Sequence, residues 1–185
     1  ESFLLDVLPE GGCIDASAGI ETLEGGEHEA HEHGAHAHEH GEEDPHIWLD
    51  PMNCVQMCRN IAAGLAELYP DKQAVIEQNL SAVTAEYEAA QAYGEDALKD
   101  LSCRALVTFH DGFSYFADAF SLTIAAAMEV ESGSEPSAKE LEAIISIVEN
   151  GKIPAVFTET NGETGSAQVV ANETGCKVYT LDMAI

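Results

Sequence analysis

The chain has 185 residues, of which 45% are apolar and 22% are charged, a balance typical of a globular protein with a hydrophobic core. Its 34 acidic residues far outnumber its 7 Lys and Arg, which gives a formal net charge of -27. So acidic a chain argues against binding to nucleic acid or to an anionic membrane through basic patches, and its negative field attracts cations. No apolar run reaches the roughly 20 residues that a membrane-spanning helix needs.

Both ends of the sequence indicate a fragment of a longer protein. The chain begins without an initiator Met at Glu1 and stops at Ile185, directly after a run typical of a strand. Absent targeting signals therefore say nothing about location.

The first part of the chain is predicted to hold little regular structure. Residues 2–8 favour a short helix or turn, and residues 14–20 a short segment after a Gly-Gly pair. Residues 24–45 are of low complexity, with six His among glutamates and almost no apolar side chain. Such a tract buries too little surface to offset its ordering entropy, so we expect a mobile loop.

Two helices follow. Asp50 before Pro51 is a good helix start, and this helix is expected to run to about Leu68, before Pro70. Residues 71–101 form the second, whose apolar positions form one stripe. Its members are Ile76, Leu80, Val83 and Tyr87. Such a length suits a spine between two lobes.

From Cys103 the pattern alternates between strand and helix. Strands are predicted at 105–109, 122–128, 154–158 and 177–181, and helices at 112–120, 136–151 and 163–173. Gly151 is the expected C-terminal glycine of the second of these helices. This series predicts the α/β class, with a parallel sheet covered on both faces.

Potential metal ligands follow three of the predicted strands. His110, Glu159 and Asp182 each come at or just after a strand end, and His46 lies before the first strong helix. Ligands of open parallel sheets bind at the carboxyl ends of the strands, and imidazole with carboxylate suits zinc, manganese or iron. Taken singly, His110 could be a hydrogen-bonded structural residue, and Glu159 or Asp182 could cap a following helix. Three together favour a metal or catalytic site.

The low-complexity tract is a second candidate. Its histidines are His28, His31, His33, His36, His38 and His40. A flexible chain can gather several neutral imidazoles around a divalent ion, although with modest selectivity. A solvated acidic linker is the alternative interpretation. Cys54 and Cys58 share a helix face at ligand spacing, but small buried residues are the favoured interpretation of this pair.

Signatures of enzymes are missing. The sequence contains no GxSxG, no glycine-rich phosphate loop after a strand and no HExxH. The case for catalysis thus rests on ligand-type residues alone, and we expect a protein that is not an enzyme.

Several motifs together match a known family. The acidic His-rich tract leads into DPHIWLDP and a long helix, followed by LVTFHDGFSYFADAFSL, SGSEPSAKEL, VFTET and YTLD. In this order the chain resembles the solute-binding proteins of zinc and manganese ABC transporters, the ZnuA/TroA-like type. The resemblance implies two α/β lobes joined by a long helix, with one metal between them. Residues 1–70 would be the remainder of the first lobe, 71–101 the connecting helix and 102–185 the truncated second lobe.

The resemblance also assigns the ligands. His46, His110 and Asp182 match three of the four family positions, and the first His would lie upstream of Glu1. Glu159 is expected near the cleft, where it supports a ligand without binding the metal. His110 stands where zinc-type members have His and manganese-type members often have Glu, so Zn²⁺ is expected, with Mn²⁺ as the alternative.

The implied function is capture of a divalent metal outside the cytoplasm and its delivery to a membrane permease of an ABC transporter. The protein would be a monomer, in the periplasm or anchored by lipid on the outer face of the cell membrane, with the His-rich tract as an accessory. A zinc-dependent α/β hydrolase that uses the same ligands, and a metal-buffering or adhesive surface protein, are the alternatives.

Overall fold

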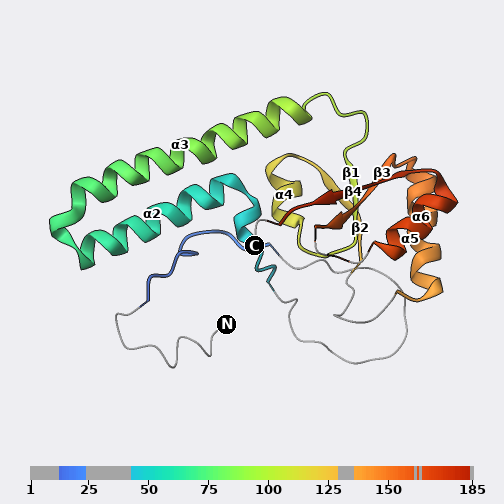
Figure 1. Ribbon diagram of the computed structural model, residues 1–185, viewed down its shortest axis with the longest axis horizontal. Coiled ribbons are helices and arrows are strands. Elements are labelled where there is room, and N and C mark those ends of the chain that lie inside the picture. The colour runs from blue at the N-terminus through green and yellow to red at the C-terminus, as the bar shows by residue number, and fades with distance from the viewer. Residues whose placement is uncertain (1–12, 24–42, 129–135, 161, 163, 184–185) are drawn as a thin grey trace.

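The computed structural model describes residues 13–23, 43–128, 136–160, 162 and 164–183. Two regions are evident in Figure 1: a helical hairpin formed by α2 (Pro51–Leu68) and α3 (Gln73–Leu98), and an α/β lobe over residues 105–181. Among the described helices, none combines the length and the apolar character needed to cross a bilayer. The predicted segment 2–8 lies outside the described residues.

Helix α2 begins and ends where the sequence predicts. A 3₁₀ turn, η1 (Ile47–Leu49), leads into it, and the Asp50 carboxylate accepts a hydrogen bond from the backbone N–H of Met52 at 2.7 Å. Pro51 occupies the first helical position, where a missing N–H costs nothing. This side-chain cap sets the direction of the helix directly after His46.

The second helix is shorter than the expected span 71–101. Pro70–Lys72 forms a 3₁₀ turn, η2, in which the N–H of Lys72 donates to the carbonyl of Tyr69 at 2.9 Å, and α3 then runs from Gln73 to Leu98. The tight turn is what reverses the chain within three residues. The predicted apolar stripe is only half-buried, because α2 is its main partner. That α3 joins two lobes stays a prediction.

The lobe contains a four-stranded parallel sheet, as predicted. Its strands are β1 (Ala105–Thr108), β2 (Thr123–Ala127), β3 (Ala155–Glu159) and β4 (Lys177–Leu181), in the order β2-β1-β3-β4. Glu159 pairs with Leu181 at the ends of β3 and β4. Because all strands are parallel, the segments that carry the predicted strand-end ligands lie at one edge of the sheet.

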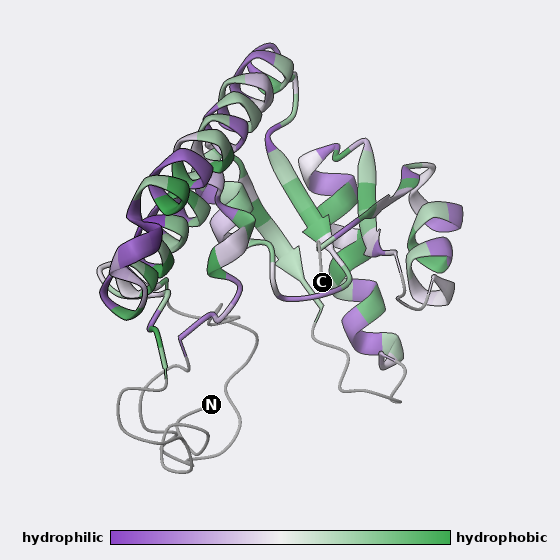
Figure 2. Ribbon diagram, turned by 60° about the vertical axis from the view of Figure 1, so that its left-hand side comes forward, coloured by the Kyte–Doolittle hydropathy of each residue, from purple (hydrophilic) through white to green (hydrophobic). Residues whose placement is uncertain are grey.

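Helices cover this sheet and close its core. α5 (Ala138–Gly151) and α6 (Gly165–Thr174) pack their apolar faces on the strands, and α4 (Ser114–Ala119) contacts β2 and η1. The green apolar surfaces of strands and helices meet in this core in Figure 2. Its buried members are Val107, Ala126, Met128, Ile144, Val148, Ile153, Val156, Ala167 and Val170.

The end of α5 differs from the expectation for a C-terminal glycine. The residue with left-handed backbone is Lys152 (φ 50°), whereas Gly151 is still helical. A Cβ at position 151 would lie 3.0 Å from Cγ1 of Ile153, a residue of the core. The glycine therefore serves close packing rather than a positive φ.

Hairpin and lobe are joined at the end of α3. The guanidinium of Arg104 donates to three carbonyl oxygens, of Leu98 at 3.0 Å and of Phe120 and Ser121 at 2.9 Å. A Cβ at Gly94 would lie 2.3 Å from Cε1 of Phe120, so α3 approaches the end of α4 as closely as a glycine allows. These contacts hold the two regions in one arrangement.

Candidate metal site

Two of the predicted ligands meet although 64 residues separate them. His110 lies two residues beyond the end of β1, and His46 directly precedes η1. Their Nε2 atoms are 3.5 Å apart, and the rings are nearly perpendicular, at an interplanar angle of 85°. The side chains are 18% and 37% exposed for His46 and His110, so the pair is open to an ion from solvent.

A carboxylate holds the far nitrogen of each ring. Asp44 Oδ1 lies 2.6 Å from Nδ1 of His46, and Glu159 Oε1 lies 2.8 Å from Nδ1 of His110. An ionised carboxylate only accepts hydrogen bonds, so these contacts suit a proton on each Nδ1. With the proton there, a neutral imidazole presents its lone pair on Nε2, the atom that faces the other ring.

This arrangement fits a divalent cation. Two nitrogens each about 2.0–2.1 Å from one zinc ion and 3.5 Å from each other subtend roughly 113–122° at the ion, near the tetrahedral value of about 109°. Carboxylates that fix the tautomer and orientation of metal-binding histidines are a common feature of zinc sites. The described residues thus present two imidazole nitrogens at a spacing that fits one zinc ion.

Asp182 lies at the same sheet edge, directly after β4. The next residue, Met183, is held against the histidine pair: its carbonyl accepts from Trp48 Nε1 at 2.9 Å. A Cβ at Gly112 would lie 2.7 Å from both the Met183 methyl and the His110 ring, so the two side chains are near one another. Within the part of the chain that the structure describes, no group of three or more His, Cys, Asp or Glu is gathered as metal ligands. The role of Asp182 as third ligand stays a prediction.

Sequence reasoning missed two residues that shape the pair. Asp44 is 5% exposed and aligns His46, and the only signal was its spacing of two from that histidine. Gly112 is buried, and its missing side chain leaves the space that the His110 imidazole occupies. The 2.8 Å contact of Glu159 with Nδ1 of His110 agrees with the supporting role expected for Glu159, which itself remains a prediction.

The remaining ligand candidates are the low-complexity tract and the pair Cys54 and Cys58. The six histidines of the low-complexity tract, from His28 to His40, lie outside the described residues. Cys54 is buried and its thiol donates to the Trp48 carbonyl at 3.1 Å. Burial is also the main cause that raises the pKa of this thiol, which disfavours the thiolate that a metal needs.

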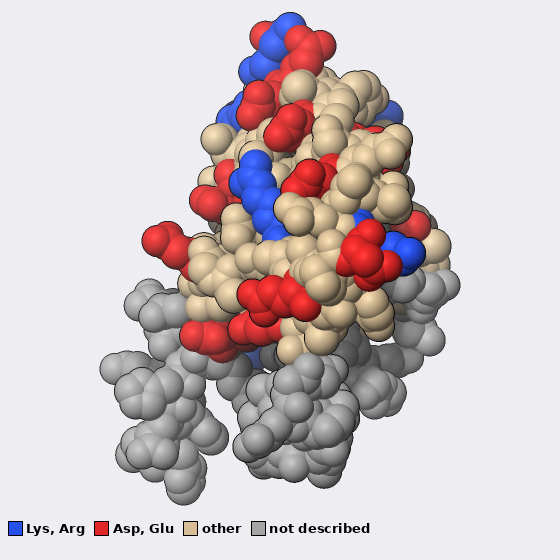
Figure 3. Space-filling view, turned by 90° about the vertical axis from the view of Figure 1, so that its left-hand side faces the viewer, with Lys and Arg blue, Asp and Glu red and all other residues tan. Residues whose placement is uncertain are grey.

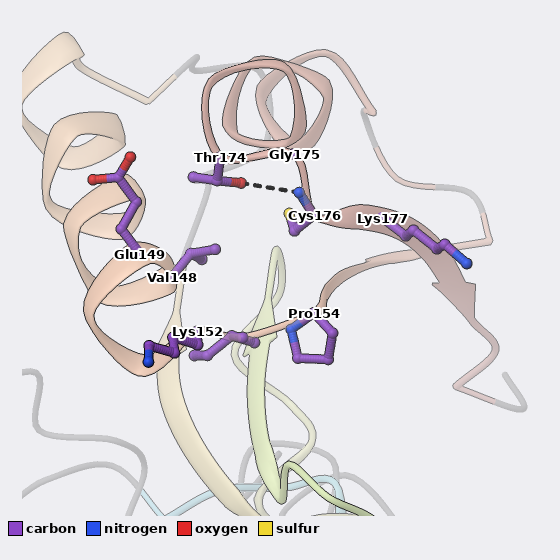
Figure 4. Close-up of a pocket in the computed structure, with 9 residues that line it drawn as sticks. Val148, Glu149, Lys152, Pro154, Thr174, Gly175, Cys176 and Lys177 are labelled. Atoms are coloured by element: carbon purple, nitrogen blue, oxygen red, sulfur yellow. Dashed lines mark hydrogen bonds between the residues drawn. The ribbon is translucent and has the colours of Figure 1, made fainter.

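A pocket of about 530 Å³ lies elsewhere, between the ends of α5 and α6. Figure 4 shows Lys152, Pro154, Cys176 and Lys177 around it, at the amino ends of β3 and β4. The histidine pair lies at the carboxyl ends of the strands, so the pocket is at the opposite end of the sheet, along the strand direction.

Acidic side chains dominate the charge of the surface. In Figure 3, red carboxylate groups are spread over the face at the end of the helical hairpin, with several smaller blue groups of Lys and Arg among them. With the net charge of -27, this distribution produces a negative field in which cations are attracted toward the protein.

Comparison with known proteins identifies the family. The model of the family "ZnuA: Zinc-uptake complex component A periplasmic" matches residues 4–184. The chain belongs to this family. The family is one of solute-binding proteins, not of enzymes, and its α/β fold is the one predicted from the sequence motifs.

Individual relatives and solved structures agree with this family assignment. The zinc-binding lipoprotein AdcA of Streptococcus pneumoniae is 31% identical over 183 residues, which are 97% of this chain and 36% of that protein. The crystal structure of a ZnuA deletion mutant with zinc bound superposes with a TM-score of 0.75 at 34% identity, over 93% of this chain and 61% of that one. The laminin-binding adhesin Lmb of Streptococcus agalactiae superposes with a TM-score of 0.79 at 26% identity, over 99% of this chain and 67% of that one. The chain thus spans about a third of the length of AdcA.

Proposed function

We propose that this chain is the metal-binding part of an extracytoplasmic receptor that captures a divalent transition metal, Zn²⁺ before Mn²⁺, and delivers it to an ABC permease. The observation that carries the proposal is the pair of facing imidazoles, His46 and His110, each aligned by a carboxylate. Family membership and the zinc-binding relatives support the same metal. A periplasmic or lipid-anchored location follows from the same relatives.

The proposed site includes Asp182 as its carboxylate ligand and Glu159 as the partner of His110. A site filled by protein ligands leaves no open position for an activated water, so we propose no catalytic activity. Imidazoles ligate only when deprotonated and ordinarily protonate near pH 6.5, so zinc affinity should fall as the pH drops below about that value.

Zinc titration of His110→Ala tests the assignment. Competition with a chelator should show a loss of affinity beyond the 10–100-fold that removal of an outer partner of a metal ligand typically costs. Deletion of residues 28–40 is the control, because a receptor keeps its tight site without the accessory tract. If His110→Ala binds zinc as tightly as the wild type while the deletion abolishes tight binding, the protein is a metal buffer instead.

Adhesion is a second candidate function, favoured by the similarity to Lmb, which is named a laminin-binding adhesin. Surface-immobilised laminin and the purified protein test it directly. Saturable binding that persists in His110→Ala would establish adhesion as independent of the metal site.

A further inference from the structure

Tyr115 on α4 ties together two segments that are remote in sequence. The side chain is 3% exposed. Its hydroxyl accepts a hydrogen bond from the backbone N–H of Leu23 and donates one to the backbone carbonyl of Asp44, both at 2.9 Å. Leu23 and Asp44 also bond directly, since the Asp44 N–H donates to the Leu23 carbonyl at 3.0 Å. We call Leu23 and Asp44 the stem, because they flank residues 24–43.

The stem leads directly to the metal site. Asp44 Oδ1 accepts from the backbone N–H of His46 at 2.9 Å and contacts Nδ1 of the same residue at 2.6 Å. The N–H and the carbonyl of Asp44 are both engaged in the stem, so the backbone that aims this carboxylate is fixed from both sides. The position of the Asp44 carboxylate therefore bears directly on the orientation of the His46 ring.

The Tyr115 hydroxyl suits this task chemically. Burial raises the pKa of this phenol above its ordinary value, so the hydroxyl stays protonated and can accept and donate at once. Without it, the part-buried N–H of Leu23 and the buried carbonyl of Asp44 would lose this partner, which favours opening of the stem.

We propose that Tyr115 is a positioning residue for metal capture: its hydroxyl closes the stem at Leu23 and Asp44 and so holds the Asp44 carboxylate on the ring of His46. The inference rests on the proposed function, because it assumes that His46 is a ligand. Because the stem joins the two ends of the His-rich tract, the proposal also predicts that the metal site holds its geometry without the tract.

The variant Tyr115→Phe removes only the hydroxyl. Zinc affinity, measured by chelator competition, should fall about 10–100-fold, the usual effect of losing an outer partner of a metal ligand. In NMR spectra of the apo protein, the proton on Nδ1 of His46 should lose its hydrogen-bonded signal. Tyr93→Phe is the matched control, because Tyr93 is 77% exposed on α3 and its variant should keep both affinity and signal.

A shorter loop between Leu23 and Asp44 should restore zinc affinity in Tyr115→Phe. Replacement of residues 24–43 by Asn-Gly turns the long connection into a two-residue turn, which lowers the entropy cost of bringing Leu23 and Asp44 together. In the Tyr115→Phe background this replacement should restore zinc affinity to within about threefold of the wild type. Unchanged affinity in Tyr115→Phe, or a loss that closure does not rescue, would overturn the proposal.

A measurement on the unaltered protein covers the case in which Tyr115→Phe does not fold. Because coupling between two sites is reciprocal, zinc should slow hydrogen exchange at the Leu23 and Asp44 amides. The Tyr69 amide, bonded to Leu65 at the far end of the hairpin, is the control. Equal effects at all three amides would refute the coupling.

These outcomes separate the inference from the function on which it rests. If His46→Ala and His110→Ala both retain tight zinc binding, the proposed site is wrong and the stem has no metal role. If both lose binding but Tyr115→Phe does not, the site stands and only the role of Tyr115 is refuted.

Discussion

The helical hairpin and the α/β lobe both contain helices, yet these helices bury different fractions of their side chains. The 26 residues of α3 include no buried residue, and the 18 of α2 include only Cys54 and Val55. In contrast, the 10 residues of α6 bury three side chains and the 14 of α5 bury two. A helix with a single helical partner covers only one stripe, whereas a helix on a sheet faces a continuous apolar surface.

The difference bears on the proposed metal site, because the histidine pair lies where the two regions meet. His46 enters from the segment that leads into α2, whereas His110 and Glu159 come from the lobe. The 3.5 Å between the two Nε2 atoms therefore depends on how the hairpin is held against the lobe. If the proposed site is correct, contacts at this junction therefore set the distance between its two histidines.

The largest contrast is expected between two isoleucines on helices. Ile144 of α5 is 6% exposed in the core of the lobe, and Ile61 of α2 is 40% exposed. Ile144→Ala should lower the free energy of unfolding by about 2–4 kcal/mol, because it leaves a cavity. Ile61→Ala should cost about 1 kcal/mol or less. Urea denaturation followed by circular dichroism measures both, and equal losses would contradict the unequal burial of the two regions.

A smaller effect is expected at the junction. Gly94→Ala places a Cβ about 2.3 Å from the Phe120 ring, so α3 or the ring must move. Alanine favours a helix over glycine by about 1 kcal/mol, and the overlap costs about 1–3 kcal/mol, so we expect a net loss of about 1 kcal/mol. Thermal unfolding measures it.

The control for Gly94→Ala is Gly165→Ala at the first position of α6, where a Cβ meets nothing within 4 Å. This variant should be neutral or slightly stabilising. A stabilised Gly94→Ala protein would show that α3 and α4 are not in close contact in solution.

The unequal burial of the two regions also explains why the sequence predicted the lobe better than the hairpin. Alternation of short apolar runs with amphipathic helices reports burial, and burial is strong in the lobe, so all four strands and their parallel arrangement were predicted correctly. At α3, weak burial left the helix ends undetermined, and the prediction overran by several residues on the C-terminal side. The turn at Pro70–Lys72 depends on local hydrogen bonds that hydrophobic periodicity does not report.

The histidine pair was predictable only in part. Strand-end position placed His110 and Glu159 at one edge of the sheet, but the approach of His46 from 64 residues away came from the family resemblance. Asp44 and Tyr115 were not found, because an acidic residue inside an acidic tract and a tyrosine in an apolar run carry no distinct signal. Their roles depend on the three-dimensional contact between α4 and the stem.

The smallest effect concerns a helix cap, a feature that α5 has and α3 lacks. The Ser137 hydroxyl accepts from the Glu140 N–H at 3.3 Å, and the Glu140 carboxylate accepts from the Ser137 N–H at 2.7 Å, whereas no side chain caps α3. Ser137→Ala should cost about 1 kcal/mol at pH 7, as loss of an N-cap usually does.

The cost of Ser137→Ala should depend on pH. Hydrogen bonds from Ser137 lower the pKa of Glu140 below its ordinary 4.5. A folded-state pKa below the unfolded one contributes stability that is complete above about pH 4.5 and is lost as the pH falls through the lowered value. The difference between wild type and Ser137→Ala in urea denaturation should therefore shrink toward acid. Ser146→Ala, also exposed on α5, should show no such trend. A pH-independent difference for Ser137→Ala would mean that the Glu140 carboxylate does not take part in the cap, so that α5 would exceed α3 by the Ser137 hydroxyl alone.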